Sequence, residues 1–416
     1  MNKNNRVNIE NPVQDVLTAF LKESAQKMLQ IAIEQEVNDF IAFYKDQKLE
    51  DGRQRVVKNG YLPERGIHTG IGAIKVEVPR TRDRSTDKDK IIFNSWWIPR
   101  HMRRTATLDV WLPILYLKGI STGDFQRVLE PLLGKGASNI SPSVISRLKS
   151  EWLTDYQMFL KRDLVGKRYV YWWVDGIYLS ARMEGDKTCM LVIIGADEQG
   201  NKELVGLIDG FRESKDSWLE LLQDLKLRGL ENGPKLAIGD GNMGFWGALS
   251  EIYPTTKWQR CWVHKTRNVL DKLPKTLQSK AKSQLHEIYF APTIADAAKA
   301  FNKFIDSYKL KYPRASECLE KDKEALLTFY SFPAEHWQSI RTTNVIESTF
   351  ATVRHRTIKS KNCFSRDTII ASVFKLLQEA QKRWKKLYGH HRLAEVINLV
   401  KFVDGIQHNG ENSYAA

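Results

Sequence analysis

Seven alternating segments between positions 168 and 264 constrain the fold more than any other feature of this 416-residue chain. Five are short, apolar and rich in β-branched or aromatic residues, as strands are, and two have the amphipathic period of helices. The strands are expected at 168–182, 188–200, 203–211, 235–240 and 257–264, and the helices at 216–229 and 243–253. The order β-β-β-α-β-α-β predicts an α/β fold: a mixed five-stranded sheet with helices on both faces.

Helical patterns dominate the rest of the chain. After the last strand the pattern is almost wholly helical, clearest at 293–312 and 316–330, and it suggests an all-α insertion. Residues 341–357 begin a further helix, with which the core resumes. The expected parts are 1–50 (helical), 51–105 (small, basic, β-containing), 106–165 (helical, DNA-binding), 166–264 (first part of the core), 265–335 (insertion), 336–390 (last part of the core, with a basic region) and 391–416 (tail).

The first half of the chain carries its own signals. An apolar stripe predicts a helix over 12–46, which either packs within its own domain or dimerises, and 73–78 reads as a strand. Two further helices, the first at 107–118, lead to a third that begins at Ser141-Pro142, a good N-cap and first-turn pair. This pattern fits a helix-turn-helix that docks in a major groove, and equally an ordinary three-helix unit. The groove contacts would come from Ser143, Arg147 and Lys149.

The charge balance points to a polyanionic partner. The chain has 64 Lys and Arg against 49 Asp and Glu, a net charge of +15, and residues 351–400 hold eleven of the basic residues against three acids. A second basic stretch, 80–104, includes Trp96 and Trp97. Basic residues interleaved with aromatics favour nucleic acid. Scattered cysteines, no secretory pattern and no long apolar stretch predict a cytoplasmic protein that is not inserted in a membrane.

Three carboxylates stand at positions that suggest chemistry. Asp175 lies inside the first strand, Asp240 follows the fourth, and Glu347 lies in a helix after the fifth. Each has an ordinary explanation as well: a hairpin turn at Asp175-Gly176, a glycine-rich turn at Asp240, and a capping box between Asn344 and Glu347. Together they have the distribution that a ribonuclease-H-like nuclease core needs. Such a site would bind two divalent cations, Mg²⁺ or Mn²⁺, through oxygen ligands.

Four ordered motifs carry a resemblance to a known family. They are VDGIYLSAR (174–182), GDGNMGFWGAL (239–249), QRCWVHKTRNVLDKLPK (259–275) and RTTNVIESTFATVRHRT (341–357), with a further upstream block at 59–83. Over roughly 50–390 the chain resembles the Mutator-type transposases of bacterial insertion sequences, which belong to the DDE class. Ser180 departs from the pattern, which leads us to expect a Lys there.

The resemblance implies a function. It implies a ribonuclease-H-like domain interrupted by an all-α insertion, in which Asp175, Asp240 and Glu347 are the catalytic, metal-binding triad. The enzyme would bind double-stranded DNA at the inverted repeats of an insertion sequence, cleave it and transfer the strand into target DNA. Because two ends must be brought together, a homodimer or larger homo-oligomer is expected. A nuclease without strand transfer, a non-catalytic DNA-binding derivative and an RNA-binding module are the alternatives.

Further residues near the triad are candidates for active-site support or DNA contact. Cys261 and His264 have the spacing of half a zinc site, but a role in shaping the active site or binding DNA is favoured. Trp262 could stack on a base, or both Cys261 and Trp262 could be buried strand residues. Basic and polar residues close to Glu347, which could hold DNA or be solvated helix residues, are Arg341, Asn344, Arg354 and Arg356.

Overall fold

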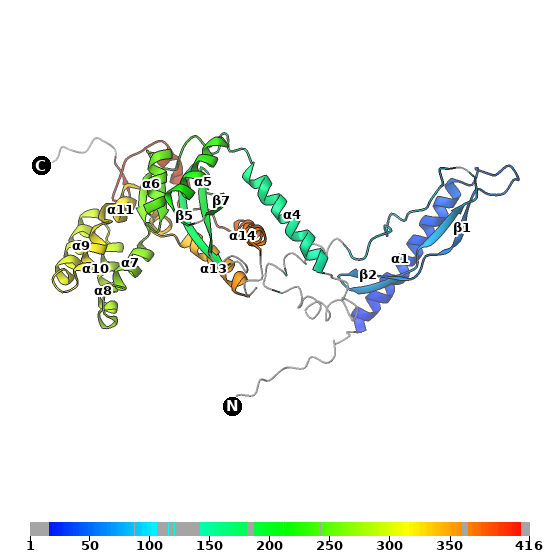
Figure 1. The fold of residues 1–416 in the computed structure, drawn as a ribbon, viewed down its shortest axis with the longest axis horizontal. Coiled ribbons are helices and arrows are strands. Elements are labelled where there is room, and N and C mark those ends of the chain that lie inside the picture. Colours follow the sequence, from blue (N-terminus) through cyan, green and yellow to red (C-terminus); the bar gives the residue numbers. More distant parts are fainter. Residues whose placement is uncertain are drawn as a thin grey trace, which may run out of the picture. The chain divides into compact units, whose positions relative to one another are not determined.

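A computed structural model shows two compact units, residues 1–148 and 149–416 (Figure 1). The structure describes residues 16–86, 88–105, 142–180, 187–210, 212–241, 243–359 and 365–408, and the single positions 115 and 120. None of the helices in these ranges is both long and apolar enough to cross a membrane.

The first unit packs one long helix against short antiparallel strands. Helix α1 (Val16–Phe43) occupies most of the range predicted for it, and the β-containing segment that follows is also present. Its strands pair as β1 with β4 and β2 with β3. A small core forms where Ile33 and Val37 of α1 meet Ile67, Ile74 and Phe93. The bounds of the strands are β1 (Val56–Tyr61), β2 (Arg65–Thr69), β3 (Gly72–Val76) and β4 (Pro79–Asp83).

The expected helix-turn-helix falls mainly outside the described residues. Its third helix is present as α4 (Pro142–Leu160), which carries Ser143, Arg147 and Lys149. Arg147 is exposed and Lys149 is half-buried. The helix at 107–118 and the one after it lie outside the described ranges, so the motif stays a prediction.

The second unit is built on the five-stranded mixed sheet that the sequence predicted. Its strand order is β7-β6-β5-β8-β9, in which β5, β6 and β7 are antiparallel and β8 and β9 run parallel to β5. The bounds are β5 (Tyr169–Ser180), β6 (Lys187–Asp197), β7 (Lys202–Gly210), β8 (Leu236–Gly239) and β9 (Lys257–Arg260).

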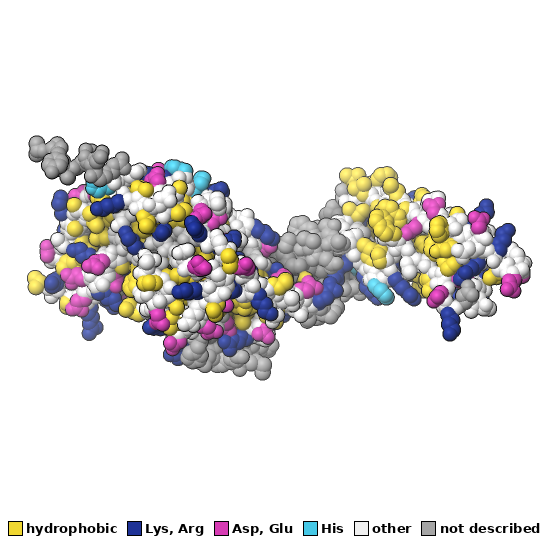
Figure 2. Space-filling model, turned by 90° about the horizontal axis from the view of Figure 1, so that it is seen from above, with side chains coloured by type: hydrophobic (Ala, Val, Ile, Leu, Met, Phe, Trp, Pro, Cys, Tyr) yellow, Lys and Arg dark blue, Asp and Glu magenta, His cyan; other side chains and the backbone are white. Residues whose placement is uncertain are grey.

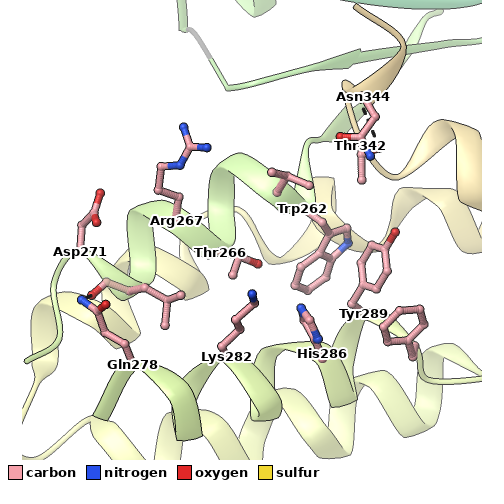
Figure 3. Close-up of a pocket in the computed structure, with 13 residues that line it drawn as sticks. Trp262, Thr266, Arg267, Asp271, Gln278, Lys282, His286, Tyr289, Thr342 and Asn344 are labelled. Carbon is pink, nitrogen blue, oxygen red and sulfur yellow. Dashed lines mark hydrogen bonds between the residues drawn. The ribbon is translucent and has the colours of Figure 1, made fainter. Parts of the chain in front are cut away.

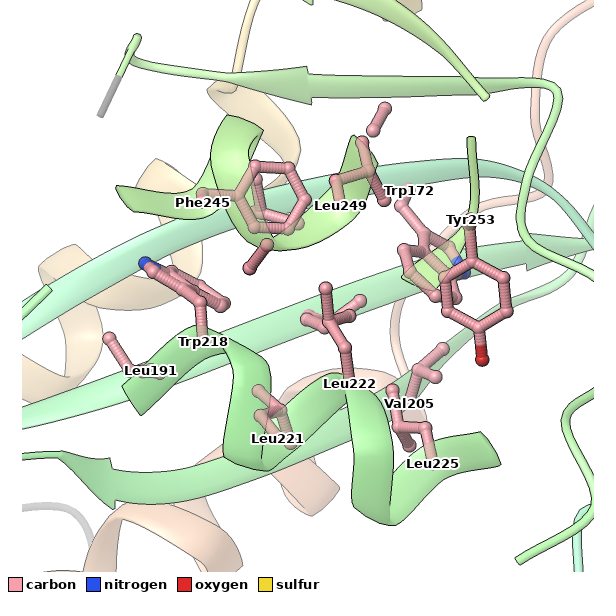
Figure 4. Packing of buried hydrophobic residues seen from close by; sticks show 14 of the residues in the cluster. Trp172, Leu191, Val205, Trp218, Leu221, Leu222, Leu225, Phe245, Leu249 and Tyr253 are labelled. Carbon is pink, nitrogen blue, oxygen red and sulfur yellow. The ribbon is translucent and has the colours of Figure 1, made fainter. Parts of the chain in front are cut away.

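Helices pack against both faces of this sheet. Helices α5 (Lys215–Leu227) and α6 (Met243–Ile252) bury Trp172, Trp218 and Phe245 between themselves and one face (Figure 4). Because strand residues alternate in direction, Tyr171 and Trp173 point to the other face, where their side chains bond to His336 and the Ser339 carbonyl. On that side α13 (Asn344–Lys359) contacts β5, and α14 (Arg366–Gln381) contacts β7.

The segment between β9 and α13 is helical, as predicted, but its boundaries differ in two places. The fifth strand ends at Arg260 rather than at 264, because the N–H of Cys261 makes the last bond to β8, at Gly239, and that of Trp262 bonds instead to the Arg341 carbonyl outside the sheet. The helix expected at 316–330 is broken at Asp322. The elements are α7 (Trp262–Leu270), α8 (Lys275–Tyr289), α9 (Ile294–Tyr308), α10 (Pro313–Glu320), α11 (Lys323–Leu327), η2 (Thr328–Ser331), η3 (Ala334–His336) and α12 (Trp337–Ile340).

The break at Asp322 has a tertiary cause. Its carboxylate forms ion pairs with Arg260, at 3.2 Å, and with Lys265, whose side chain is only 1% exposed. A buried ammonium or guanidinium needs such a partner, so this aspartate leaves the helical path to supply one. The chain then closes on the same unit with η4 (His390–Arg392), α15 (Leu393–Ile397), β10 (Phe402–Val403) and β11 (Ile406–Gln407).

Candidate active site

Asp175 lies in the middle of an uninterrupted strand. Strand β5 runs from Tyr169 to Ser180, and Asp175 is paired with Val192 of β6. The hairpin turn predicted as an alternative for Asp175-Gly176 is therefore wrong, and the chain reverses only after Ser180. The carboxylate is half-buried, and its Oδ1 accepts a hydrogen bond of 2.9 Å from the Gly176 N–H. Because Asp175 lies inside a strand, a functional role explains this acid better than a role in a turn does.

Asp240 follows β8, the strand that runs parallel beside β5. Ile238 pairs with Trp173, so the carboxyl end of β8 brings Asp240 to the part of β5 that carries Asp175. The next residue, Gly241, has φ of +88°, which L side chains rarely adopt, and the buried Arg260 guanidinium packs against it and would have to move for any side chain there. A glycine-rich turn is therefore present, and it holds the acid at the sheet edge.

Glu347 stands in the first turn of α13. That helix begins at Asn344 itself, one residue earlier than a capping box with Asn344 as N-cap requires, and the N–H of Asn344 bonds to the Thr342 hydroxyl. The hydrogen bond of the Glu347 carboxylate comes from the Thr343 hydroxyl, at 2.8 Å. The capping box thus does not account for Glu347, whose carboxylate lies toward α7.

A buried threonine joins α7 to α13. The Thr343 hydroxyl lies 3.2 Å from the Cys261 sulfur, 3.4 Å from Nδ1 of His264 and 2.8 Å from the Glu347 carboxylate. His264 Nδ1 is itself 3.6 Å from that carboxylate. Cys261 precedes α7 as its N-cap, and His264 lies in its first turn, so both are helix-start residues and not strand residues.

Electrostatics link this cluster to the two aspartates. Burial, followed by the neighbouring Asp240 charge, raises the pKa of Asp175 to about 7, while His264 acts in the opposite direction. The pKa of His264 is raised, first by its hydrogen bond with the Cys261 sulfur and also by Glu347 and Asp175. Burial opposes ionisation of the Cys261 thiol, but hydrogen bonds from His264 and Thr343 outweigh it and lower its pKa. His264 therefore interacts with Glu347 and Asp175, and Asp175 in turn interacts with Asp240.

The structure adds a fourth acid that sequence reasoning missed. Glu213 lies just before α5, and its side chain packs against Gly176, the residue after Asp175. Its charge contributes to the raised pKa of Asp175, and it borders the same small hollow as Asp175 and Asp240. No strand end or spaced motif marked this residue. A glutamate directly before a predicted helix start was the only available signal.

Of the remaining candidate residues that the structure describes near Glu347 and Cys261, two are turned into the protein and two are exposed. Arg341 is turned inward: its guanidinium stacks over the Tyr289 ring and donates to the Tyr289 carbonyl at 2.6 Å. Trp262 is buried, and its indole N–H bonds to the Leu326 carbonyl, so its ring faces are not available for stacking on a base. Asn344 and Arg354 are exposed on α13. The side chain of Arg356 lies outside the described residues.

Comparison with known proteins identifies relatives along nearly the whole chain. A family model described as "Transposase, Mutator family" matches residues 3–387. The transposase for insertion sequence element IST2 of Acidithiobacillus ferrooxidans is 52% identical over 291 residues, covering 68% of this chain and 96% of that protein. The transposase for IS6120 of Mycolicibacterium smegmatis is 47% identical over 285 residues, covering 68% and 88%. The transposase for IS256 in transposon Tn4001 of Staphylococcus aureus is 27% identical over 354 residues, covering 83% and 87%.

Proposed function

Because this chain belongs to the Mutator family of transposases, we propose that it cleaves DNA at the end of an insertion sequence and joins the freed 3′-hydroxyl to another phosphodiester. Family membership confirms the resemblance drawn from the four motifs. The observation that carries the proposed chemistry is that three acids from distant parts of the chain interact in one series: Asp240 with Asp175, and both Asp175 and Glu347 with His264.

The proposed core is ribonuclease-H-like and of the DDE class. Its support is the strand order β7-β6-β5-β8-β9, with one acid in the central strand and a second at the end of its parallel neighbour. Helices α7 to α12 then form the insertion that separates the sheet from the helix of the third acid. One acid thus lies in a central strand, the second directly follows the neighbouring strand, and the third lies in a helix packed on the sheet.

The three acids would bind two divalent cations, Mg²⁺ or Mn²⁺. Carboxylate oxygens are the donors that these hard cations prefer, and the half-buried Asp175 beside Asp240 and Glu213 is negative charge that a cation would offset. When bound, the ions supply stabilisation of the attacking and leaving oxygens of an in-line displacement. Zinc fits less well: Cys261, His264 and Glu347 offer three ligand atoms within 4.8 Å of one another, whereas a structural zinc site takes four.

The other residues of the site would position the acids and the DNA. His264, whose Nδ1 lies 3.6 Å from the Glu347 carboxylate, can hold that carboxylate or donate to a phosphate oxygen. Asn344 and Arg354 are exposed on the same helix as Glu347 and can reach DNA beside it. Arg147 and Lys149 of α4, with Ser143, are proposed to contact the inverted repeats.

The proposed partner is double-stranded DNA, bound by two or more copies of the chain. On the face seen in Figure 2, Lys and Arg side chains are spread over both units rather than gathered in one patch. A dispersed distribution suits an enzyme that holds both a transposon end and a target, since each phosphate contact adds a salt-dependent increment of affinity. Joining two ends requires at least a homodimer on the DNA.

The proposal is tested by cleavage and joining on DNA that carries the element's own end, with Mg²⁺ or Mn²⁺. Wild-type protein should cut and join. Asp240→Asn should still bind the same DNA, but its cleavage rate should be about 10⁴-fold lower. Asp306→Asn, at an exposed position of α9, is the matched control and should retain full activity. Cutting without joining would identify a nuclease, and binding without cutting would identify a non-catalytic derivative; either contradicts the proposal.

A further inference from the structure

A cleft between α7 and α8 opens beside the candidate active site. Its volume is about 500 Å³, within the range of small-ligand pockets and far too small for a duplex. Trp262 and Thr266 line it from α7, Lys282 and His286 point into it from α8, and Asn344 borders it at the start of α13 (Figure 3). All three helices belong to the second unit.

The lining combines exposed aromatic rings with cations. Phe290 ends α8 with its side chain 64% exposed, and its ring contacts those of His286 and Tyr289 edge-on. Lys282 and Arg267 add positive charge, and among the described residues neither forms an ion pair. The Phe290 ring and the two exposed cations are thus open to a ligand from solvent. Aromatic faces and cations together are what an unpaired base and its phosphate require.

The cleft shares two helices with the acidic site. Helix α7 presents Trp262 to the cleft and His264 to the acids, two residues apart. Helix α13 presents Asn344 to the cleft and Glu347 to the acids, one turn apart. A strand whose phosphodiester lies at the acids therefore has this cleft as an immediate neighbour, and a nucleotide that leaves the base stack there has a place to go.

We propose that the cleft binds one unpaired nucleotide of the DNA strand that is processed at the acidic site. The base packs against the rings of Phe290 and His286, and its phosphate is held by Lys282 and Arg267. Taking a base out of the stack is unfavourable, and stacking and cation contacts of this kind offset that loss. The proposal rests on the proposed function, because it is the acids that bring a DNA strand to the mouth of the cleft.

Photocrosslinking tests this directly. 5-Iodouracil is placed at each position flanking the cleavage site, and after irradiation the crosslinked peptide is located by mass spectrometry. One position should crosslink to residues 286–290 of α8. Phe290→Leu, which keeps an apolar side chain without a ring, should lower that yield and the cleavage rate at least tenfold, and Phe290→Tyr should restore both. Lys282→Glu should also lower both, whereas Lys299→Ala on α9 should change neither.

The outcomes separate this inference from the proposed function. If DNA is bound and cut but no position crosslinks to α8, the nucleotide cleft is overturned and the transposase chemistry stands. If α8 crosslinks but wild-type protein never cuts, the cleft stands and the proposed chemistry falls. An unchanged cleavage rate in both Phe290→Leu and Lys282→Glu would also overturn the cleft.

Discussion

At the scale of single residues, Thr343 connects more of the candidate site than any of the acids does. It is buried, and its one hydroxyl group lies within hydrogen-bonding distance of Cys261, His264 and Glu347. A hydroxyl has one hydrogen to donate and two lone pairs, so this group fixes the orientation of both the histidine and the carboxylate. Residues that orient metal ligands and catalytic groups in this way commonly matter 10- to 100-fold.

Replacing Thr343 with Val should therefore separate shape from hydrogen bonding. Thr343→Val keeps the branched side chain but removes the hydroxyl, so we expect a cleavage rate about 10- to 100-fold lower and a loss of about 1–3 kcal/mol in the free energy of unfolding. Thr343→Ser restores the hydroxyl and should recover most of the rate. Single-turnover cleavage and denaturant unfolding measure the two effects. Equal rates for the Val and Ser variants would contradict the assigned role.

At the scale of elements, hydrophobic periodicity correctly predicted most segments as helix or strand. Tertiary contacts explain the boundaries that it predicted wrongly. Strand β5 was expected at 168–182 and runs from Tyr169 to Ser180, because its apolar pattern is continuous. The residues after Arg260 are apolar too, but only Cys261 still bonds to β8, at Gly239; the Trp262 N–H bonds to the Arg341 carbonyl outside the sheet, and α7 begins there. Such long-range bonds leave no local trace in a sequence.

The ion pairs of Asp322 are expected to stabilise the junction between β9, α7 and α11. Asp322→Asn leaves the buried Arg260 and Lys265 without a carboxylate, which should cost about 3–5 kcal/mol in the free energy of unfolding. Glu287→Gln, which breaks the exposed pair with Lys303, should cost less than about 1 kcal/mol. Denaturant unfolding of the two variants decides the matter. If both variants lose less than about 1 kcal/mol in the free energy of unfolding, the buried ion pairs of Asp322 contribute little to stability.

In the first unit, the pairing of β1 with β4 should weaken in acid. Burial opposes ionisation of Asp83, but hydrogen bonds from Arg55 and from the backbone N–H groups of Ile91 and Ser85 outweigh it and hold the pKa of Asp83 well below its usual range. A lowered pKa in the folded state contributes stability above the unfolded value, about 4, and this is lost as the pH falls below it.

Hydrogen exchange in the peptides of β1 and β4, corrected for intrinsic rates, measures this loss. Protection should fall between about pH 5 and pH 2 in the wild type. In Asp83→Asn it should already be low at pH 7 and change little on acidification. The same pH dependence in both proteins would assign the effect to other groups.

At the scale of the whole molecule, the order of the motifs along the chain indicated the three acids, and the fold places their elements, β5, the end of β8 and the start of α13, in one unit. Asp175, Asp240 and Glu347 were expected at one site because their elements recur in a fixed order. Glu213 and Thr343 were not expected, because each reaches the site through packing that no spacing in the sequence encodes. Motif order thus indicates the candidate acids but not the residues that pack around them.

The first unit offers a basic cleft of about 560 Å³ that suits the DNA backbone. Burial, followed by the charge of Arg103, lowers the pKa of Arg65, which shows positive groups crowded together. We expect Arg103→Ala to weaken DNA binding at low salt and to reduce the slope of log affinity against log salt by about 1. Lys27→Ala removes the same charge from an exposed pair on α1 and should change the slope little. Indistinguishable slopes would argue against phosphate contact in this cleft.

The measurement that tests the central claim most directly is the cleavage rate of three single variants, Asp175→Asn, Asp240→Asn and Glu347→Gln, beside their binding of Mn²⁺ on a DNA end. Residues that act as one metal site fail together, so each variant should lose Mn²⁺ binding and about 10⁴-fold in rate, and the triple variant should be little worse. All four should still bind DNA. If any one of the three acids can be neutralised with activity retained within tenfold, the proposed triad is wrong.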